Sequence, residues 1–438
     1  MELIEKVKDL SFSEVRNLLT NSPYKLMVKE SAAHPNLYLI TYNQRSSAFN
    51  EPLVSNCRGI VLEKDTNKVV GYPFDKFWNY NEKTAATVDF ANAKVQEKLD
   101  GSLIKVYWYA PEQTWIVGTS GTIDAKDAKV GKANIKNFYE IFISCWEETW
   151  RGATGSLAPA PQFPFDQLNK NYTYMLEAMH PATMVVVRHD RPRLTHIGTR
   201  DNISLLELNP DDTVIPHVPR PPTFPAYITM EALQEAASTT FTDPFRMEGF
   251  VVVDQQFRRV KVKTLAYVMA HNGPGPRRKS DTGTRGKEYS MTVEDEKRVM
   301  FAVLNGETSE MAAYYPNLEP RMKKVKEMFE SVVKDFGMAV QSLWRRGRKA
   351  KGPEAVMKEY FLGLNECYSH WFTVLEALYK SEEGMRELLG VEVEKKTVEQ
   401  EGVTELLRNM LVKTYKKNGD QCMELLKLLN ITFSTKMM

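Results

Sequence analysis

The sequence predicts an α+β fold in which a domain of antiparallel sheet is followed by an all-helical C-terminal domain. Three observations indicate this division. Short runs of β-type residues fill the chain up to about residue 290, apolar residues then recur every three or four positions, and a basic segment rich in glycine and proline separates the two regions. We therefore expect a first domain over residues 1–270, a basic linker over 271–290 and a helical domain over 291–438.

The strand predictions rest on short runs of apolar and β-branched residues. In the last run Lys261 and Lys263 face one way and the neighbouring valines face the other, because side chains alternate along a strand. Helices are expected between these runs, at 2–20 and roughly at 131–150. The predicted strands cover residues 37–43, 58–63, 102–109, 114–119, 172–178, 248–254 and 258–264.

The remaining segments are predicted from their proline content and from helical spacing. Two proline-rich segments, 152–166 and 209–225, are expected to be surface loops. Beyond the linker, the apolar residues from Met322 to Leu343 return to one face of a helix, which the segment 345–353 ends. Further helices are expected in the rest of the chain.

Composition excludes several classes of protein. The chain has 438 residues, of which 42% are hydrophobic and 26% charged, so global disorder is excluded and a sizeable core is possible. The 58 basic and 56 acidic residues nearly cancel, so nucleic-acid binding would depend on local patches such as 277–279 and 345–349. The apolar runs are too short to cross a membrane, and the chain lacks a secretory signal and CxxC pairs. We therefore expect a cytoplasmic protein without membrane partner, zinc or disulfide.

One short motif carries a chemical signal: Lys98-Leu99-Asp100-Gly101-Ser102, directly before the predicted strand 102–109. A lysine is a nucleophile only when its amine is neutral, and burial or neighbouring cations lower the pKa of a lysine side chain. Alone, such a motif is more often a solvated turn. It is accompanied by Cys57-Arg58-Gly59-Ile60-Val61 upstream, and by Leu176-Glu177-Ala178, Glu248-Gly249-Phe250-Val251-Val252 and Val260-Lys261-Val262-Lys263 downstream. No Walker, GxGxxG or HExxH motif is present.

This ordered set of motifs resembles that of the covalent nucleotidyltransferase superfamily, which comprises DNA ligases, RNA ligases and capping guanylyltransferases. Finer features over about residues 37–340 resemble the phage-type single-strand RNA ligases of type one, the tRNA-repair ligases of T-even phages. The family carries a Lys-Ser-Lys-Gly-Ser pattern after the nucleophile, whereas residues 118–122 here contain no lysine. The finer features are Thr41-Tyr42-Asn43, the run from Asp75 to Glu82, Tyr267-Val268-Met269-Ala270-His271, Val303-Leu304-Asn305-Gly306-Glu307 and the helix 320–336.

The resemblance implies an ATP-dependent RNA ligase that joins 5′-phosphate and 3′-hydroxyl ends of single-stranded RNA through lysyl-AMP and RNA-adenylate intermediates. The first domain would be the adenylyltransferase (nucleotidyltransferase) domain, and the helical domain would set RNA specificity. The implied catalytic residues are Lys98, as the AMP-lysine nucleophile, Lys261 and Lys263. The implied ATP-binding residues are Tyr42, Arg58, Lys76, Glu177, Glu248, Lys261, Lys263 and Tyr267, and Glu248 would also hold Mg2+, directly or through water.

The resemblance also implies the partners. The substrate would be single-stranded RNA or a broken tRNA anticodon loop, handled by a monomer in the cytoplasm, or the host cytoplasm if the protein is viral. Asp100 is expected to bridge neighbouring cations, and Cys57, His180 and His271 are expected to be structural.

Two alternatives stay open. The first is a capping guanylyltransferase or a DNA ligase, both of which commonly append an OB-type β-domain after the Lys-x-Lys strand, whereas here a helical tail is expected. The second is a non-catalytic RNA-binding module whose helical tail recruits a partner.

Overall fold

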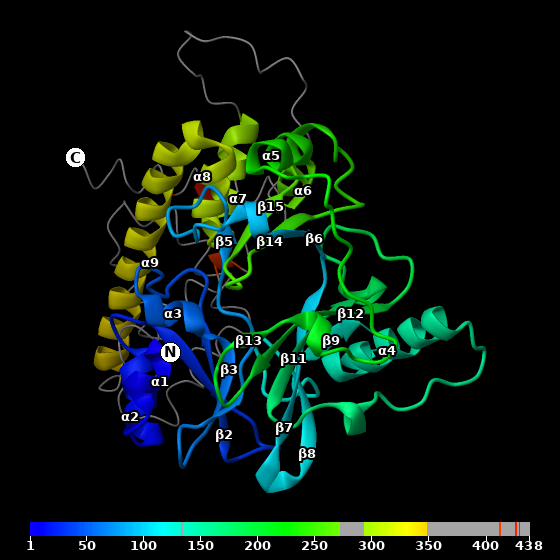
Figure 1. The fold of residues 1–438 in the computed structure, drawn as a ribbon. Coiled ribbons are helices and arrows are strands. Elements are labelled where there is room, and N and C mark those ends of the chain that lie inside the picture. The colour runs from blue at the N-terminus through cyan, green and yellow to red at the C-terminus, as the bar shows by residue number, and fades with distance from the viewer. Residues whose placement is uncertain (133–134, 272–292, 348–410, 413–424, 427–428, 430–438) are drawn as a thin grey trace. The chain divides into compact units, whose positions relative to one another are not determined.

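The computed structural model describes residues 1–132, 135–271, 293–347, 411–412, 425–426 and 429 (Figure 1). The chain divides into two compact units, Met1–His271 and Asn272–Met438. The first unit is built on antiparallel sheets, as the sequence predicted. Among the described residues, no helix combines the length and the apolar character needed to cross a membrane.

The N-terminal part of the first unit is a four-stranded antiparallel sheet covered by three short helices. The buried side chains between them include Leu3, Leu19, Leu53, Ile40 and Ile60. The strands are β1 (Leu26–Glu30), β2 (Leu37–Tyr42), β3 (Arg58–Glu63) and β4 (Val69–Gly71), and the helices are α1 (Glu2–Val7), α2 (Phe12–Thr20) and α3 (Pro52–Asn56).

The prediction of one helix over 2–20 is wrong, because the chain forms two helices there. Ser11 lies between them with extended backbone and caps α2: its Oγ accepts a hydrogen bond from the backbone amide of Glu14. The Glu14 carboxylate in turn accepts from the Ser11 amide at 2.8 Å. This capping box requires a non-helical residue at position 11, so α1 has to end before it.

A second, five-stranded antiparallel sheet packs against the first. Leu39 and Val61 from the first sheet meet Tyr107 and Ile116 from the second. The helix α4 (Phe138–Thr154) covers the far face, so this part has the layer order helices, sheet, sheet, helix. The strands, in spatial order, are β13 (Glu207–Leu208), β12 (Arg193–Asp201), β11 (Tyr172–Met179), β7 (Ser102–Tyr109) and β8 (Thr114–Thr119).

The helix expected at 131–150 begins later than predicted. The hairpin of β9 (Lys129–Lys132) and β10 (Ile135–Asn137) precedes it, and the Asn137 side chain caps α4 by accepting from the Glu140 amide at 3.1 Å. The two proline-rich segments were expected to be surface loops, and this is only partly right. Phe163, Ile215 and Val218 are buried in the core beside α4, so both segments are anchored by apolar side chains.

A third sheet of four strands completes the first unit. Its strands are β5 (Trp78–Asn79), β15 (Arg259–Lys263), β14 (Gly249–Val253) and β6 (Lys94–Lys98), in that order, and β5 is parallel to β15. The helix α5 (Met230–Thr239) packs on it through Met230 and Leu233, which meet Phe250 and Val260. The helix α6 (Leu265–His271) follows β15 directly.

The described residues of the second unit are helical. They form α7 (Val293–Asn305), α8 (Thr308–Tyr314) and α9 (Glu319–Gly347). The predicted apolar stripe is buried in α9 from Met322 to Val332. The linker with its basic run 277–279 and the side chains of 345–349 lie outside the described residues, as do nearly all residues of the helices expected beyond 353.

Candidate functional site

The end of the third sheet brings three of the predicted site residues into contact. The strand register places Gly249 opposite both Lys98 and Lys263, so these three positions form one row across the sheet. Glu248 directly precedes Gly249 and is 4% exposed. Its Oε2 lies 2.7 Å from the Lys98 amine, and its Oε1 lies 3.5 Å from the Lys263 amine. One buried carboxylate therefore joins the two lysines.

Gly249 allows this row to form. Its φ is +153°, a conformation that side chains with a Cβ rarely adopt. A Cβ at this position would lie 2.3 Å from the Val262 carbonyl oxygen and 2.5 Å from the Lys263 Cα. Glycine is therefore required where β14 approaches β15.

We expect Gly249→Ala to lower the free energy of unfolding by about 1–3 kcal/mol, because the added methyl group collides with the β15 backbone. Urea unfolding of the full chain measures this. The control is Gly152→Ala in α4, where an added Cβ meets no atom within 4 Å and alanine suits the helix better. Equal unfolding midpoints for both variants would contradict the prediction.

Glu177 joins the site from the end of β11. Its Oε1 accepts a hydrogen bond from the Gly101 amide at 3.1 Å. Burial raises the pKa of Glu177 to about 7, and the neighbouring Glu248 carboxylate acts in the same direction. Lys98 and Arg58 oppose this shift because they favour the ionised form. The two carboxylates and two of the predicted cations therefore share one electrostatic environment.

This pKa predicts a dependence of stability on pH. The folded protein holds a proton on Glu177 up to about pH 7, whereas the unfolded chain releases it near its ordinary value of 4.5. Rising pH between these values therefore favours the unfolded state. We expect the free energy of unfolding of wild type to fall relative to that of Glu177→Gln as the pH rises from 4.5 to 7. Above pH 7 the difference between the two free energies should stay constant.

Urea unfolding at a series of pH values tests this, with Glu147→Gln on the exposed face of α4 as the control. If the free energies of unfolding of wild type and Glu177→Gln changed in parallel with pH, the prediction would be contradicted.

Asp100 fixes the turn after Lys98, and the expectation that it bridges cations is wrong. Its Oδ2 accepts from the amides of Val186 and Val187 at 3.0 and 2.8 Å. Its Oδ1 accepts from the Tyr267 hydroxyl at 3.1 Å. Three neutral donors thus surround this buried carboxylate, as a buried charge requires.

Tyr267 is 3% exposed, and its ring stacks on His271 at 5.7 Å between centroids. The Lys263 amine lies 5.4 Å from the same ring centre. Tyr267 therefore connects the nucleophile turn with the Lys-x-Lys strand. His180 is also engaged, because its Nδ1 accepts from the Ala182 amide at 2.9 Å.

Arg58 begins β3, where the backbone makes a tight contact with residues 118–122. Gly59 has a φ of +92°, and a Cβ there would lie 2.5 Å from the Ser120 carbonyl oxygen. This is the segment without lysines. The structure places two lysines from other strands at this contact: the buried Lys105 donates to the Gly59 carbonyl, and Lys29 donates to the Gly121 carbonyl at 3.0 Å.

Lys76 and Tyr42 belong to an aromatic cluster. The Lys76 amine lies 4.8, 4.7 and 4.4 Å from the ring centres of Tyr42, Phe49 and Trp78, which are cation–π distances. It also donates to the Gln44 side chain at 3.2 Å. Trp78 belongs to the run from Asp75 to Glu82 that resembles the family, whereas no motif or spacing in the sequence indicated Phe49.

Phe77 joins the remaining predicted cations. The Arg58 guanidinium lies 5.4 Å from its ring centre and the Lys261 amine 5.8 Å. The predicted residues thus fall into three groups. Lys98, Glu248 and Lys263 form a contact cluster with Glu177 beside it. Arg58 and Lys261 both lie near Phe77, and Lys76 and Tyr42 belong to the aromatic cluster.

The carboxylates next to Lys98 are Glu177 and Glu248. Both oxygens of Glu248 already contact lysine amines, so this carboxylate would hold Mg2+ through the waters that the ion keeps, and the ion would bind chiefly through substrate phosphates. Within the part of the chain that the structure describes, no group of three or more His, Cys, Asp or Glu side chains is placed to hold a metal ion.

Comparisons with known proteins agree with these motifs. Residues 56–267 match the model of a family described as RNA ligase. An RNA ligase of Rhodothermus phage RM378 is 28% identical over 193 residues, which cover 37% of this chain and 41% of the phage protein. The match confirms the resemblance to phage-type RNA ligases.

A second relative, from Autographa californica nuclear polyhedrosis virus, carries the description bifunctional polynucleotide kinase/RNA ligase. It is 25% identical over 325 residues, which cover 70% of this chain and 41% of that protein. The chain thus spans about 41% of the length of both relatives. Among solved structures, an archaeal ATP-dependent RNA ligase aligns over 69% of this chain and 67% of its own, with 12% identity and a TM-score of 0.36. A likeness that slight carries no further conclusion.

Proposed function

We propose that this chain, whose residues 56–267 match the RNA ligase family, is an ATP-dependent RNA ligase that joins a 5′-phosphate to a 3′-hydroxyl end of single-stranded RNA. The observation that carries the proposal is the Lys98 amine held 2.7 Å from the buried carboxylate of Glu248, with Lys263 on the other side of that carboxylate. A nucleophile, a proton acceptor and a phosphate-binding cation thus come from three neighbouring strands.

In the first step the Lys98 amine attacks the α-phosphate of ATP. A nitrogen–phosphorus bond forms, the bond to the leaving pyrophosphate breaks, and the product is lysyl-AMP. The amine has to lose a proton first, and Glu248 is within hydrogen-bond distance to accept it. Lys261, Lys263 and Arg58 would neutralise the charge that develops on the phosphates. Mg2+, held near Glu248 through its waters, would add to this neutralisation.

The next two steps reuse the same cations. The 5′-phosphate of the RNA attacks lysyl-AMP, which frees Lys98 and gives the RNA-adenylate. A 3′-hydroxyl then attacks the RNA phosphate of this adenylate, and AMP leaves as the new phosphodiester bond forms. Glu177 would bind a ribose hydroxyl of the nucleotide, while Tyr42, Lys76 and Tyr267 would complete the ATP site.

A capping guanylyltransferase or a DNA ligase would use the same first step. The described segment after β15 is helical in α6, α7, α8 and α9, which favours an RNA ligase over enzymes that append an OB-type domain. A non-catalytic RNA-binding module would not need Lys98 paired with a buried carboxylate, because such a pair is costly to desolvate.

The test is to incubate the full chain separately with α-labelled ATP and α-labelled GTP, and then with 5′-phosphorylated single-stranded RNA. We expect covalent labelling by ATP and sealing of the RNA. Labelling by GTP alone would support a guanylyltransferase, and no labelling by either nucleotide would support the binding module.

The natural substrate is a finer proposal. We propose a break in a single-stranded loop, such as a tRNA anticodon loop, with residues 291–438 setting RNA specificity. The test compares sealing of a broken hairpin loop with sealing of a nicked duplex. Preference for the duplex would contradict it.

A further inference from the structure

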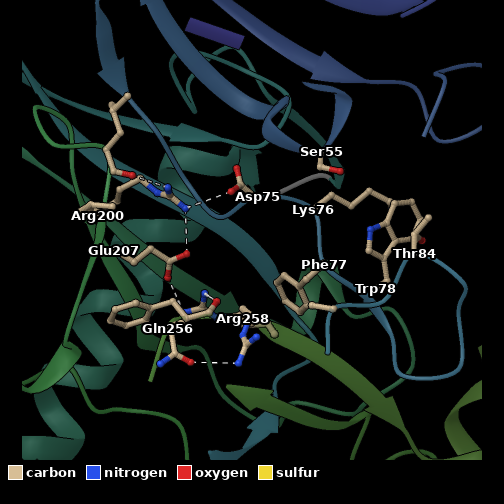
Figure 2. Close-up of a pocket in the computed structure, with 15 residues that line it drawn as sticks. Ser55, Asp75, Lys76, Phe77, Trp78, Thr84, Arg200, Glu207, Gln256 and Arg258 are labelled. Atoms are coloured by element: carbon tan, nitrogen blue, oxygen red, sulfur yellow. Dashed lines mark hydrogen bonds and ion pairs between the residues drawn. The ribbon is translucent and has the colours of Figure 1, made fainter. Parts of the chain in front are cut away.

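A pocket of about 630 Å3 lies within the first unit, and Figure 2 shows the side chains that line it. The segments from Asp75 to Trp78 and from Gln256 to Arg259 contribute much of its lining. Phe77 lines it too, and the same ring lies close to the Arg58 guanidinium and the Lys261 amine. The Phe77 ring therefore borders the pocket and also contacts the two proposed phosphate-binding cations.

The pocket is distinct from the nucleophile's own surroundings. Lys98, Glu177, Glu248 and Lys263 do not line it. Its volume lies within the range of roughly 300–1,000 Å3 that is usual for sites of small molecules. The pocket can thus hold a group that reacts at the catalytic cluster without covering Lys98 itself.

The lining combines the two features that bind single-stranded nucleic acid. Phe77 and Trp78 offer aromatic rings on which a base can stack, and Figure 2 shows Phe77 lying between Trp78 and Arg258 in this view. Hydroxyl and amide groups of Ser55, Thr84 and Gln256 supply hydrogen bonds. The charged lining residues are four cations, Lys76, Arg200, Arg258 and Arg259, against two carboxylates, Asp75 and Glu207.

One wall of the pocket is held rigid by a buried ion-pair network. Glu207 lies between two arginines, with Oε1 3.0 Å from Arg200 and Oε2 2.6 Å from Arg259. The guanidinium groups also stack on Tyr72 and Phe74, at 3.9 and 4.4 Å from the ring centres. Asp75 also lies 3.8 Å from Arg200, and Arg258 pairs with the buried Asp254 at 2.7 Å. The four lining cations therefore meet three carboxylates and keep one positive charge in excess, to which Arg58 and Lys261 add near Phe77.

We propose that this pocket takes the 5′-terminal nucleoside of the phosphorylated RNA strand, with its base against Phe77 and Trp78 and its phosphate toward Arg58 and Lys261. The proposal rests on the proposed RNA ligase function. A 5′ end suits the pocket better than a 3′-hydroxyl end, because the terminal phosphate is the group that the shared cations attract.

The test uses two variants that leave the proposed catalytic residues intact. Thr84→Trp places a large ring in the pocket from an exposed position, and Arg258→Gln removes a cation from its lining. The controls are Thr87→Trp, which is exposed and does not line this pocket, and Arg246→Gln, whose side chain is 87% exposed elsewhere.

Three reactions are measured on the full chain: self-labelling by ATP without RNA, transfer of AMP from preformed lysyl-AMP to a 5′-phosphorylated oligoribonucleotide, and sealing of preadenylated RNA to an acceptor strand. We expect self-labelling to stay within about twofold of wild type. We expect the RNA concentration that half-saturates AMP transfer to rise about tenfold in both pocket variants and to be unchanged in both controls.

The other outcomes separate the possible occupants. Slower self-labelling with normal transfer would make the pocket part of the ATP site, and a rise confined to the acceptor-strand concentration would assign it to the 3′-hydroxyl end. Unchanged transfer and sealing in both pocket variants would also overturn the proposal. If wild type itself is not labelled, the RNA ligase function fails instead.

Discussion

Lys98→Ala is expected to reduce covalent labelling by ATP below detection while leaving the fold intact. The alanine has no atom that can form the bond to the α-phosphate, and no other described lysine combines the 2.7 Å contact with Glu248 and a place in the KxDG turn. The fold should survive because the Lys98 side chain is 21% exposed and Glu248 keeps Lys263 as its partner.

The readout is gel labelling with α-labelled ATP, alongside urea unfolding of the same preparations. Lys94→Ala is the matched control, since Lys94 begins the same strand and its side chain is 60% exposed. Persistent labelling of Lys98→Ala would mean that another residue is the nucleophile. Sealing of preadenylated RNA should persist in the variant at a reduced rate, because that step does not need the amine as a nucleophile.

Strand patterns and ordered motifs were sufficient to predict the antiparallel sheets and the clustering of Lys98, Glu248 and Lys263. The reason is physical: each motif occupies a strand end, and antiparallel pairing brings such ends into one row. Sequence alone did not show that Glu248 would be shared by both lysines, because that depends on the backbone bend at Gly249.

Contacts between distant segments were beyond the reach of sequence reasoning. Phe49 reaches Lys76 through a loop, and Lys29 meets the segment 118–122 from a distant strand, so no local spacing encodes these pairs. The single helix over 2–20 failed for a local reason instead. The apolar period runs through both α1 and α2, while the capping serine between them was not weighed against it.

Replacing the Glu248 carboxylate is expected to slow self-labelling by ATP strongly. Glu248→Gln keeps the size of the side chain but removes the charge between the two amines at 2.7 and 3.5 Å. Breaking a buried ion pair on one side costs about 3–5 kcal/mol, and an equal loss in the transition state slows a reaction about 10²- to 10⁴-fold. We expect the rate of self-labelling to fall by that factor.

The pH dependence of this variant distinguishes a proton acceptor from a merely structural partner. Without the carboxylate, hydroxide from the solvent has to take the proton of the Lys98 amine, so the labelling rate of Glu248→Gln should rise steadily with pH. Glu97→Gln is the control, because Glu97 precedes Lys98 on β6 and therefore faces the other side of the sheet. A labelling rate for Glu248→Gln within about threefold of wild type at every pH would exclude Glu248 as the acceptor, since a loss that small is under about 1 kcal/mol.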